Sequence, residues 1–184
     1  MVERREQIVA AALELLEADG REAMSMRSIA ERVGVRAPSL YKHFPDKAAV
    51  ELELTVIGLT EMTEALEAAE PGLLPCARAY RNFALARPHL YRLTTTNPLP
   101  RPLLPEGLDD RAAGPILRAM HGRADLARAV WAFAHGMVML ELDGRFPPGA
   151  DLEPAWTAGC TTFQSDVGGD GRDPRPVHRR TRHR

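Results

Sequence analysis

Apolar residues recur at helical spacing along most of this chain, and they do not alternate as the residues of a half-buried strand would. Ile8, Ala12, Leu15 and Leu16, for example, share one face of a segment that Gly20 closes. Ala, Leu, Glu and Arg dominate, whereas β-branched and aromatic residues, which favour strands, are sparse. The sequence therefore predicts an all-α protein.

Gly, Pro and capping residues divide the helical pattern into segments. Pro71-Gly72 and Pro147-Pro148-Gly149 interrupt it most sharply, and the proline-rich stretch 97–107 is expected to be a loop. After Gln164 the chain is rich in Gly, Pro and Arg, so residues 165–184 are predicted to be a disordered Arg-rich tail. The helices expected from the apolar spacing and from the Gly, Pro and capping residues cover residues 3–19, 26–33, 38–44, 47–69, 74–86, 88–94, 110–118, 123–146 and 152–164.

The near-neutral net charge of −1 conceals a local excess of basic residues. Residues 25–47 contain five Arg or Lys side chains and two acidic ones, which favours a surface for a polyanion. No run of about 20 apolar residues suggests a membrane span, and the N-terminus does not resemble a secretory signal. Two cysteines, Cys76 and Cys160, lack metal-ligand spacing, so we expect a cytoplasmic protein without metal or cofactor.

Two short helices joined by a tight turn make residues 25–44 the most informative part of the chain. Ser25 is a suitable N-cap, Ala30 allows the two helices to approach, and Gly34 suits the backbone of the turn. Val35 and Leu40 are expected to point into a small core. This is the plan of a helix-turn-helix, which would occupy residues 1–47 together with the first helix.

Pro38 opens the third helix, where its missing N–H group is not needed. A helix that begins there can present its first residues to base edges in a major groove. Arg27 and Arg36 are expected to bind guanine or phosphate, and Ala37 and Pro38 to contact a thymine methyl group. The phosphate oxygens would be bound by Ser39, Tyr41, Lys42, His43 and Lys47.

Residues 123–146 form the strongest helical segment after the N-terminus. Leu126, Val130, Phe133 and Met137 make one apolar stripe, and a second consists of Trp131, Ala134, Val138 and Leu142. A helix that is apolar on two sides should be buried against its own domain and against something else.

No convincing catalytic constellation is present. His135 with Glu141 and Asp143 could suggest a metal or acid–base site, but helical spacing places them on different faces. Ser39 and His43 lack an orienting carboxylate. The residues alone thus favour a non-enzymatic DNA-binding protein. They leave open a catalytic helical protein that uses His135 or Cys76, and an interaction module whose basic face binds RNA or acidic protein.

The stretch SMRSIAERVGVRAPSLYKHFPDKAAV, with the preceding AAALELLEADG, resembles the DNA-binding domain of TetR-family transcriptional regulators. The resemblance runs from about residue 4 to 54. Its most specific part is the pattern of Gly34, Val35, Leu40, Tyr41, His43, Phe44 and Lys47. It implies that Arg27, Ala37, Ser39, Tyr41 and Lys47 contact operator DNA, and that Arg36 and Lys42 contribute to operator choice.

The second half resembles the C-terminal subtype of that family named for its Trp-His-Gly motif, here as Trp131, His135 and Gly136. The resemblance implies that residues 48–164 form a helical regulatory and dimerisation domain, and that the protein is a homodimeric repressor released by an unknown small molecule. The dimer interface expected on this basis contains Leu126, Val130, Phe133, Met137 and Trp156. The expected ligand pocket, for which core packing is an equally good interpretation, contains Met62, Phe83, Tyr91, Met120, Trp131, His135 and Met139.

Overall fold

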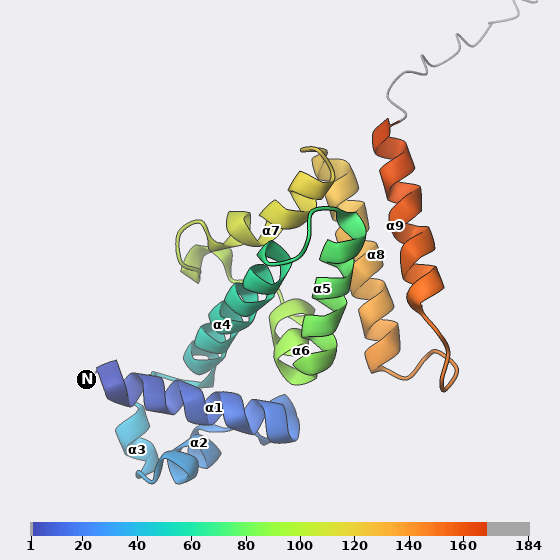
Figure 1. The fold of residues 1–184 in the computed structure, drawn as a ribbon. Helices are drawn as coiled ribbons and strands as arrows, with labels where there is room; N and C mark the ends of the chain where they lie inside the picture. The colour runs from blue at the N-terminus through green and yellow to red at the C-terminus, as the bar shows by residue number, and fades with distance from the viewer. Residues whose placement is uncertain (1, 169–184) are drawn as a thin grey trace, which may run out of the picture.

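The computed structural model describes residues 2–168, and throughout this part the regular structure is helical (Figure 1). The all-α prediction is therefore confirmed. The helices are α1 (Val2–Ala23), α2 (Met26–Val33), α3 (Ala37–Leu40), α4 (Lys47–Glu67), α5 (Leu73–Ala86), α6 (Pro88–Thr96), α7 (Leu108–Ala119), α8 (Ala124–Leu142) and α9 (Glu153–Gly168), with a short 3-10 turn, η1 (Arg101–Leu103).

The first three helices form one end of the molecule, and α4 leads from them into a larger bundle (Figure 1). The apolar residues Ile8, Leu16, Ile29, Leu40 and Phe44 are all fully or almost fully buried at the α1–α3 end. Their burial explains why three such short elements hold together, because each helix covers apolar surface that the others leave exposed.

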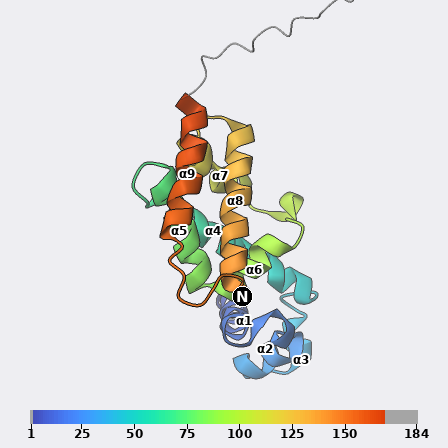
Figure 2. The same cartoon turned by 90° about the vertical axis from the view of Figure 1, so that its right-hand side faces the viewer.

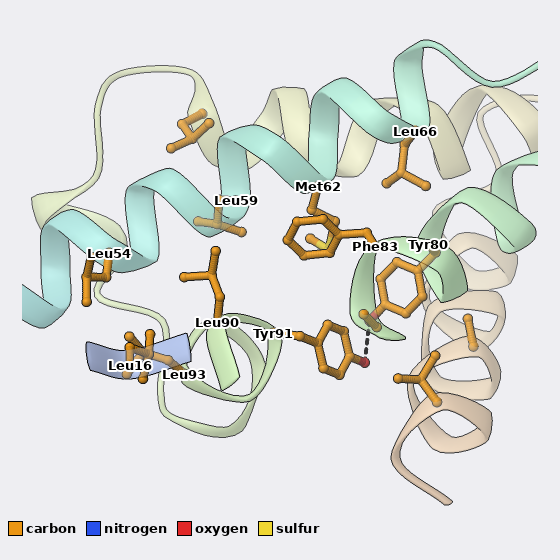
Figure 3. Close-up of a cluster of buried hydrophobic side chains, with 14 of the residues drawn as sticks. Leu16, Leu54, Leu59, Met62, Leu66, Tyr80, Phe83, Leu90, Tyr91 and Leu93 are labelled. Carbon is orange, nitrogen blue, oxygen red and sulfur yellow. Dashed lines mark hydrogen bonds between the residues drawn. The ribbon is translucent and has the colours of Figure 1, made fainter. Parts of the chain in front are cut away.

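The larger bundle is built around α4, which packs against α5, α6 and α7. Leu54, Leu59, Met62 and Leu66 lie along one side of α4 and meet side chains of α5 and α6 (Figure 3). At Gly58 the approach of α6 is so close that an added Cβ atom would lie 2.3 Å from Thr94 Oγ1. Glycine is therefore the residue that permits this crossing of α4 and α6.

Arginine side chains connect the two parts of the molecule. Arg87, between α5 and α6, donates to Glu17 of α1 at 3.1 Å and to Glu61 of α4 at 2.8 Å. Arg21, at the end of α1, forms two hydrogen bonds with Glu51 of α4, of 2.8 and 2.9 Å. The orientation of α1–α3 is thus tied to the bundle by ion pairs in addition to the chain itself.

The last two helices, α8 and α9, lie side by side at the far end of the molecule from α2 and α3 (Figures 1 and 2). Phe133 of α8 packs against Trp156 and Phe163 of α9, with ring centroids 5.7 and 5.9 Å apart. Gly159 makes this contact possible, since a Cβ atom there would come within 2.2 Å of the Phe133 ring.

Several predicted boundaries differ from the structure. Gly20 breaks the helical geometry of α1 with φ 80° and ψ 176°, as predicted, but a second short helical piece follows the kink and extends α1 to Ala23. The segment predicted at 123–146 ends at Leu142, because Gly144 turns the chain with φ 61°. Helix α9 continues to Gly168, past the predicted start of a disordered tail at residue 165. The remainder of that predicted tail lies outside the described residues.

Candidate nucleic-acid interface

Local hydrogen bonds define both ends of α2. The Ser25 hydroxyl accepts from the Ser28 backbone N–H at 3.1 Å, and the Ser28 hydroxyl accepts from the Ser25 N–H at 2.8 Å. This reciprocal capping box satisfies donors that the first turn of a helix leaves free. At the other end Gly34 has φ 74°, and the Val35 N–H reaches the Ala30 carbonyl at 2.9 Å. The predicted N-cap and glycine turn are both present.

Helix α3 is shorter than the predicted 38–44 and begins at Ala37, one residue before Pro38. After Leu40 the chain continues as turns, with the N–H groups of His43 and Phe44 both donating to the Leu40 carbonyl. Pro45 prevents a regular helix from continuing beyond Phe44, because the residue before a proline avoids helical geometry. Pro38 still lies in the first turn, as expected.

Buried side chains hold this segment so that its polar residues face outward. Leu40 and Phe44 are 1% and 0% exposed, whereas Tyr41 between them is 54% exposed. Of the residues predicted to contact DNA, Ala37, His43 and Lys47 are half-buried. The others are exposed: Arg27, Arg36, Pro38, Ser39, Tyr41 and Lys42.

Two of the predicted phosphate-binding cations already have partners in the chain. The Arg27 guanidinium donates to Glu31 at 2.9 Å, one helical turn further along α2, and this bond raises the pKa of Arg27. Lys47 Nζ donates to the Arg21 carbonyl at 2.9 Å and lies 3.6 Å from Glu51. Lys47 therefore helps to join α1 to α4, so its ammonium group is less free than the sequence suggested.

Arg5 supports the recognition segment, a role that was not predicted from the sequence. Its guanidinium lies 4.1 Å from the centroid of the Phe44 ring and donates to the His43 carbonyl at 2.9 Å. It also pairs with Glu53 of α4. Arg5 thereby fixes the junction between α3 and α4, and the 38 residues that separate Arg5 from His43 left no local signal for this contact.

In the bundle, Tyr80, Tyr91 and His135 form a hydrogen-bonded chain. The two tyrosine hydroxyls are 2.9 Å apart (Figure 3), and the Tyr91 hydroxyl is 2.7 Å from His135 Nδ1. Burial lowers the pKa of His135, and burial with the neighbouring Tyr80 raises the pKa of Tyr91. A neutral imidazole has one donor and one acceptor nitrogen, so the hydrogen bond between His135 and Tyr91 needs no charge on His135.

The residues predicted to line a ligand pocket line neither the small cavity beside Tyr80 nor the groove beside Asn97. Met62, Phe83, Tyr91 and Met120 are each at most 8% exposed and belong to one continuous core cluster. A cavity between α5, α7 and α8 has a volume of about 10 Å³, which holds one water molecule at most. Trp131 is 47% exposed and stacks beside His135, while Met139 packs at the edge of the core. Core packing is thus what the structure shows for most of this set.

The predicted dimer residues also lie mainly inside the chain. Leu126, Val130 and Trp156 are 8%, 2% and 1% exposed, and Phe133 and Met137 pack against the core. Leu126, Val130 and Trp156 therefore offer little surface to a partner, whereas Phe133 and Met137 are half-buried. The periodicity correctly indicated a helix with two apolar faces, but it did not distinguish the inner face from the outer one.

The possible catalytic groups are held in separate interactions. Glu141 pairs with Arg81, Asp143 pairs with Arg92, and His135 bonds to Tyr91. Burial raises the pKa of the Cys76 thiol to about 11, which disfavours a reactive thiolate. Within residues 2–168, no cluster of His, Cys, Asp and Glu could hold a metal ion, and no helix is both long and apolar enough to span a membrane.

Comparisons with known families agree with this geometry. Residues 8–54 match the model for bacterial regulatory proteins of the tetR family, which covers α2, α3 and their supporting core. Residues 73–163 match the model for a tetracyclin repressor-like C-terminal domain. This second match does not confirm the Trp-His-Gly subtype, which stays a prediction.

Individual relatives extend the similarity across most of the chain. The HTH-type transcriptional regulator Rv0681 of Mycobacterium tuberculosis is 29% identical over 161 residues, covering 76% of this chain and 71% of the relative. YobS, an HTH-type transcriptional regulator of Bacillus subtilis, is 32% identical over 90 residues, or 46% of this chain and 47% of the relative. The crystal structure of the candidate regulatory protein SCO4313 superposes with a TM-score of 0.73 at 25% identity, covering 89% of this chain and 96% of the other. The chain has a helix-turn-helix and a helical second domain, and it matches both family models. It therefore belongs to the TetR family of transcriptional regulators.

Proposed function

We propose that this TetR-family regulator is a homodimeric repressor that leaves its operator when a small molecule binds. The observation that carries the DNA-binding part is the recognition segment itself. Leu40 and Phe44 are buried and hold Tyr41 and Lys42, which lie between them, on the outside, while Arg36 and Ser39 are exposed just before Leu40. Rigid presentation favours base contact, because little side-chain and backbone freedom remains to be lost on binding.

The outward faces of α8 and α9 support dimerisation, in place of the stripe predicted from sequence. On α8 the exposed or half-buried residues Ala129, Ala132, Gly136 and Leu140 follow one another at helical spacing. On the adjacent α9 the exposed residues at matching intervals are Ala155, Ala158, Thr162 and Ser165. Small side chains allow helices to pack closely, and Leu140 is 44% exposed in the single chain. We therefore assign the dimer contact to these faces.

The match of residues 73–163 to a tetracyclin repressor-like C-terminal domain supports control by a small molecule. A ligand acts by binding more tightly to the form whose two recognition helices do not fit successive major grooves. We also propose a cytoplasmic location. We further propose that the protein has no catalytic activity, because the candidate catalytic groups are engaged in structural bonds.

The test begins with selection of genomic DNA fragments by the purified protein at low salt. On the selected operator, Arg36→Ala should cost about 1–3 kcal/mol of binding free energy and relax the preference at particular base pairs. Tyr41→Phe should weaken binding to all sequences alike, since the lost hydroxyl serves a phosphate.

Arg118→Ala is the matched control, because Arg118 is an exposed arginine on α7, in the other domain. It should leave both affinity and preference unchanged. A protein that selects no fragment and sediments as a monomer contradicts the proposed function. Equal affinities for the wild type, Arg36→Ala and Tyr41→Phe contradict the assigned interface.

A further inference from the structure

The interior of the regulatory bundle is closely packed around Met62, Phe83 and Tyr91 in the described chain. Its central residues form a continuous core, and the cavity beside Tyr80 and Ala134 measures about 10 Å³. Pockets for small molecules usually enclose about 300–1,000 Å³. The cavity beside Tyr80 is far smaller than such a pocket.

A groove of about 450 Å³ lies where the DNA-binding end meets the regulatory bundle. One wall is the first turns of α4, including Ala48, Leu52 and Thr55, and the opposite wall is the end of α6 with the following loop to Leu103. Arg21, from the end of α1, contributes to the same groove. The three segments come together because α4 and α6 pack against each other and both contact α1 (Figure 1).

The lining is mainly apolar. Leu52, Leu93 and Leu99 contribute to it together with Leu103, which is 66% exposed on η1. Pro98 and Pro100 stiffen the loop wall, because a proline ring restricts the backbone. A ligand with an apolar body would therefore cover leucine side chains that water now contacts.

The charged groups of the groove exclude most acidic ligands. Glu51 accepts two hydrogen bonds from Arg21, which are the main reason that the pKa of Glu51 is lowered, so this carboxylate stays ionised. Asp46 adds a second carboxylate to the lining. Since Arg21 is already occupied by Glu51, an anion would meet more repulsion than attraction.

One polar group in the groove is weakly engaged. The Asn97 amide accepts from Arg21 at 3.4 Å and donates to the Leu93 carbonyl at 3.4 Å, both at the long limit of a hydrogen bond. A ligand carbonyl or amide can replace these contacts with shorter ones. The groove therefore suits a neutral, mainly apolar molecule with one such polar group.

We propose that this junction groove is an effector site for neutral, mainly apolar molecules that carry a carbonyl or amide. The inference deepens the proposed function and rests on it for the regulatory consequence. A molecule bound there contacts α4, which carries the recognition segment at its N-terminal end, and the α6 loop, which belongs to the bundle. It therefore favours one angle between the two and changes operator affinity.

Nile red, a neutral fluorescent dye with an apolar ring system and one carbonyl, is the probe. Titration of the purified full chain should raise the dye fluorescence in a saturable manner. Ala48→Phe places a ring in the groove from an exposed position, and it should weaken dye binding by at least about tenfold. Leu103→Asp removes apolar lining from the other wall and should also weaken binding.

Each variant has a matched control outside the groove. Ala68→Phe adds the same ring at an exposed position just beyond the C-terminal end of α4, and Leu85→Asp alters an exposed leucine of α5. Both controls should bind the dye as the wild type does, and all four variants should retain the wild-type unfolding temperature. Absence of saturable dye binding, or equal binding by the groove and control variants, overturns the site.

The regulatory part is tested by linkage. Saturating dye should change the operator dissociation constant by about 5–150-fold, and operator DNA should change the dye affinity by the same factor. Groove-specific dye binding with no effect on operator affinity overturns the effector role. If the protein selects no DNA, the proposed function fails, while the dye titration still decides separately whether the groove binds such molecules.

Discussion

The recognition segment and helix α8 differ in how far the sequence alone predicts which of their faces is internal. Around α2 and α3, Ser25 caps the N-terminus of α2 and Gly34 forms the turn after it, as the residue types predict. Leu40 enters the core while Tyr41 faces outward, also as predicted. On α8, the stripe of Leu126 and Val130 that was expected at a dimer interface is buried within the chain. Local turn chemistry identifies orientation reliably, whereas an apolar stripe does not identify its partner.

The physical reason is the number of ways in which each region can bury its apolar surface. A short helix followed by a tight turn has one small core available, so its inner face is determined by the turn. Helix α8 is apolar on two sides and has α5, α7 and α9 beside it. Which side becomes internal depends on all of those neighbours together.

The largest effect that sharpens this comparison is expected for Phe44→Ala. Phe44 is fully buried beside Arg5, so its loss should lower the free energy of unfolding by about 3–5 kcal/mol. Phe163→Ala is the matched change at the other end, where the ring is only half-buried on α9, and it should cost clearly less. Urea unfolding followed by circular dichroism measures both. Equal losses would show that the small recognition core is no more tightly packed than the α8–α9 contact.

An intermediate effect is expected at two helical glycines. Gly58→Ala places a methyl group against Thr94 and Leu90, and it should destabilise the fold by about 1–3 kcal/mol. Gly136→Ala meets nothing within 4 Å in the single chain, and it should stabilise α8 by about 0.5–1 kcal/mol.

Thermal unfolding at two protein concentrations separates folding from association. Because Gly136 lies on the proposed dimer face, its gain in helix stability should be accompanied by weaker self-association in sedimentation experiments. A Gly136→Ala protein that associates as tightly as the wild type argues against the assignment of that face.

The smallest effect is a pH dependence at His135. Burial lowers its pKa in the folded chain, so the unfolded chain binds the proton more readily. Stability is therefore lost as the pH falls below the ordinary histidine value of about 6.5. His135→Gln retains an acceptor for Tyr91 without this titration, and its stability should fall less between about pH 7.5 and pH 5.

The control for this prediction is His121→Gln, since His121 is an exposed histidine with a positive φ of 52° outside the bundle core. Its pH profile should follow that of the wild type. Parallel profiles for His135→Gln and the wild type would mean that the Tyr80–Tyr91–His135 chain tolerates a charged imidazole.

Much of the fold could be predicted because its signals are local. The all-helical class, most helix positions and the helix-turn-helix follow from spacing, caps and punctuation over a few residues. The outward position of Arg36, Ser39 and Tyr41 follows from the inward position of Leu40. The end of α3 at Leu40 was not predicted, because the turns that follow it depend on how Leu40 and Phe44 enter the core together.

The ligand and dimer residues could not be predicted in the same way. Met62, Phe83 and Met120 have the side chains of either a pocket or a core, and only the distances between helices show that they fill the space. Similarly, nothing near Lys47 in the sequence indicates that its ammonium group contacts the Arg21 carbonyl.

By itself, the sequence determined that the protein is helical and that an N-capped helix and a glycine turn precede the recognition segment. These features depend on backbone geometry within one or two helical turns. The tertiary structure alone decided which face of α8 is internal, how Arg5 supports Phe44, and where space for a ligand remains. These features depend on contacts between residues far apart in the chain. Many helical arrangements satisfy the same periodicity, and only close packing of the whole set selects one.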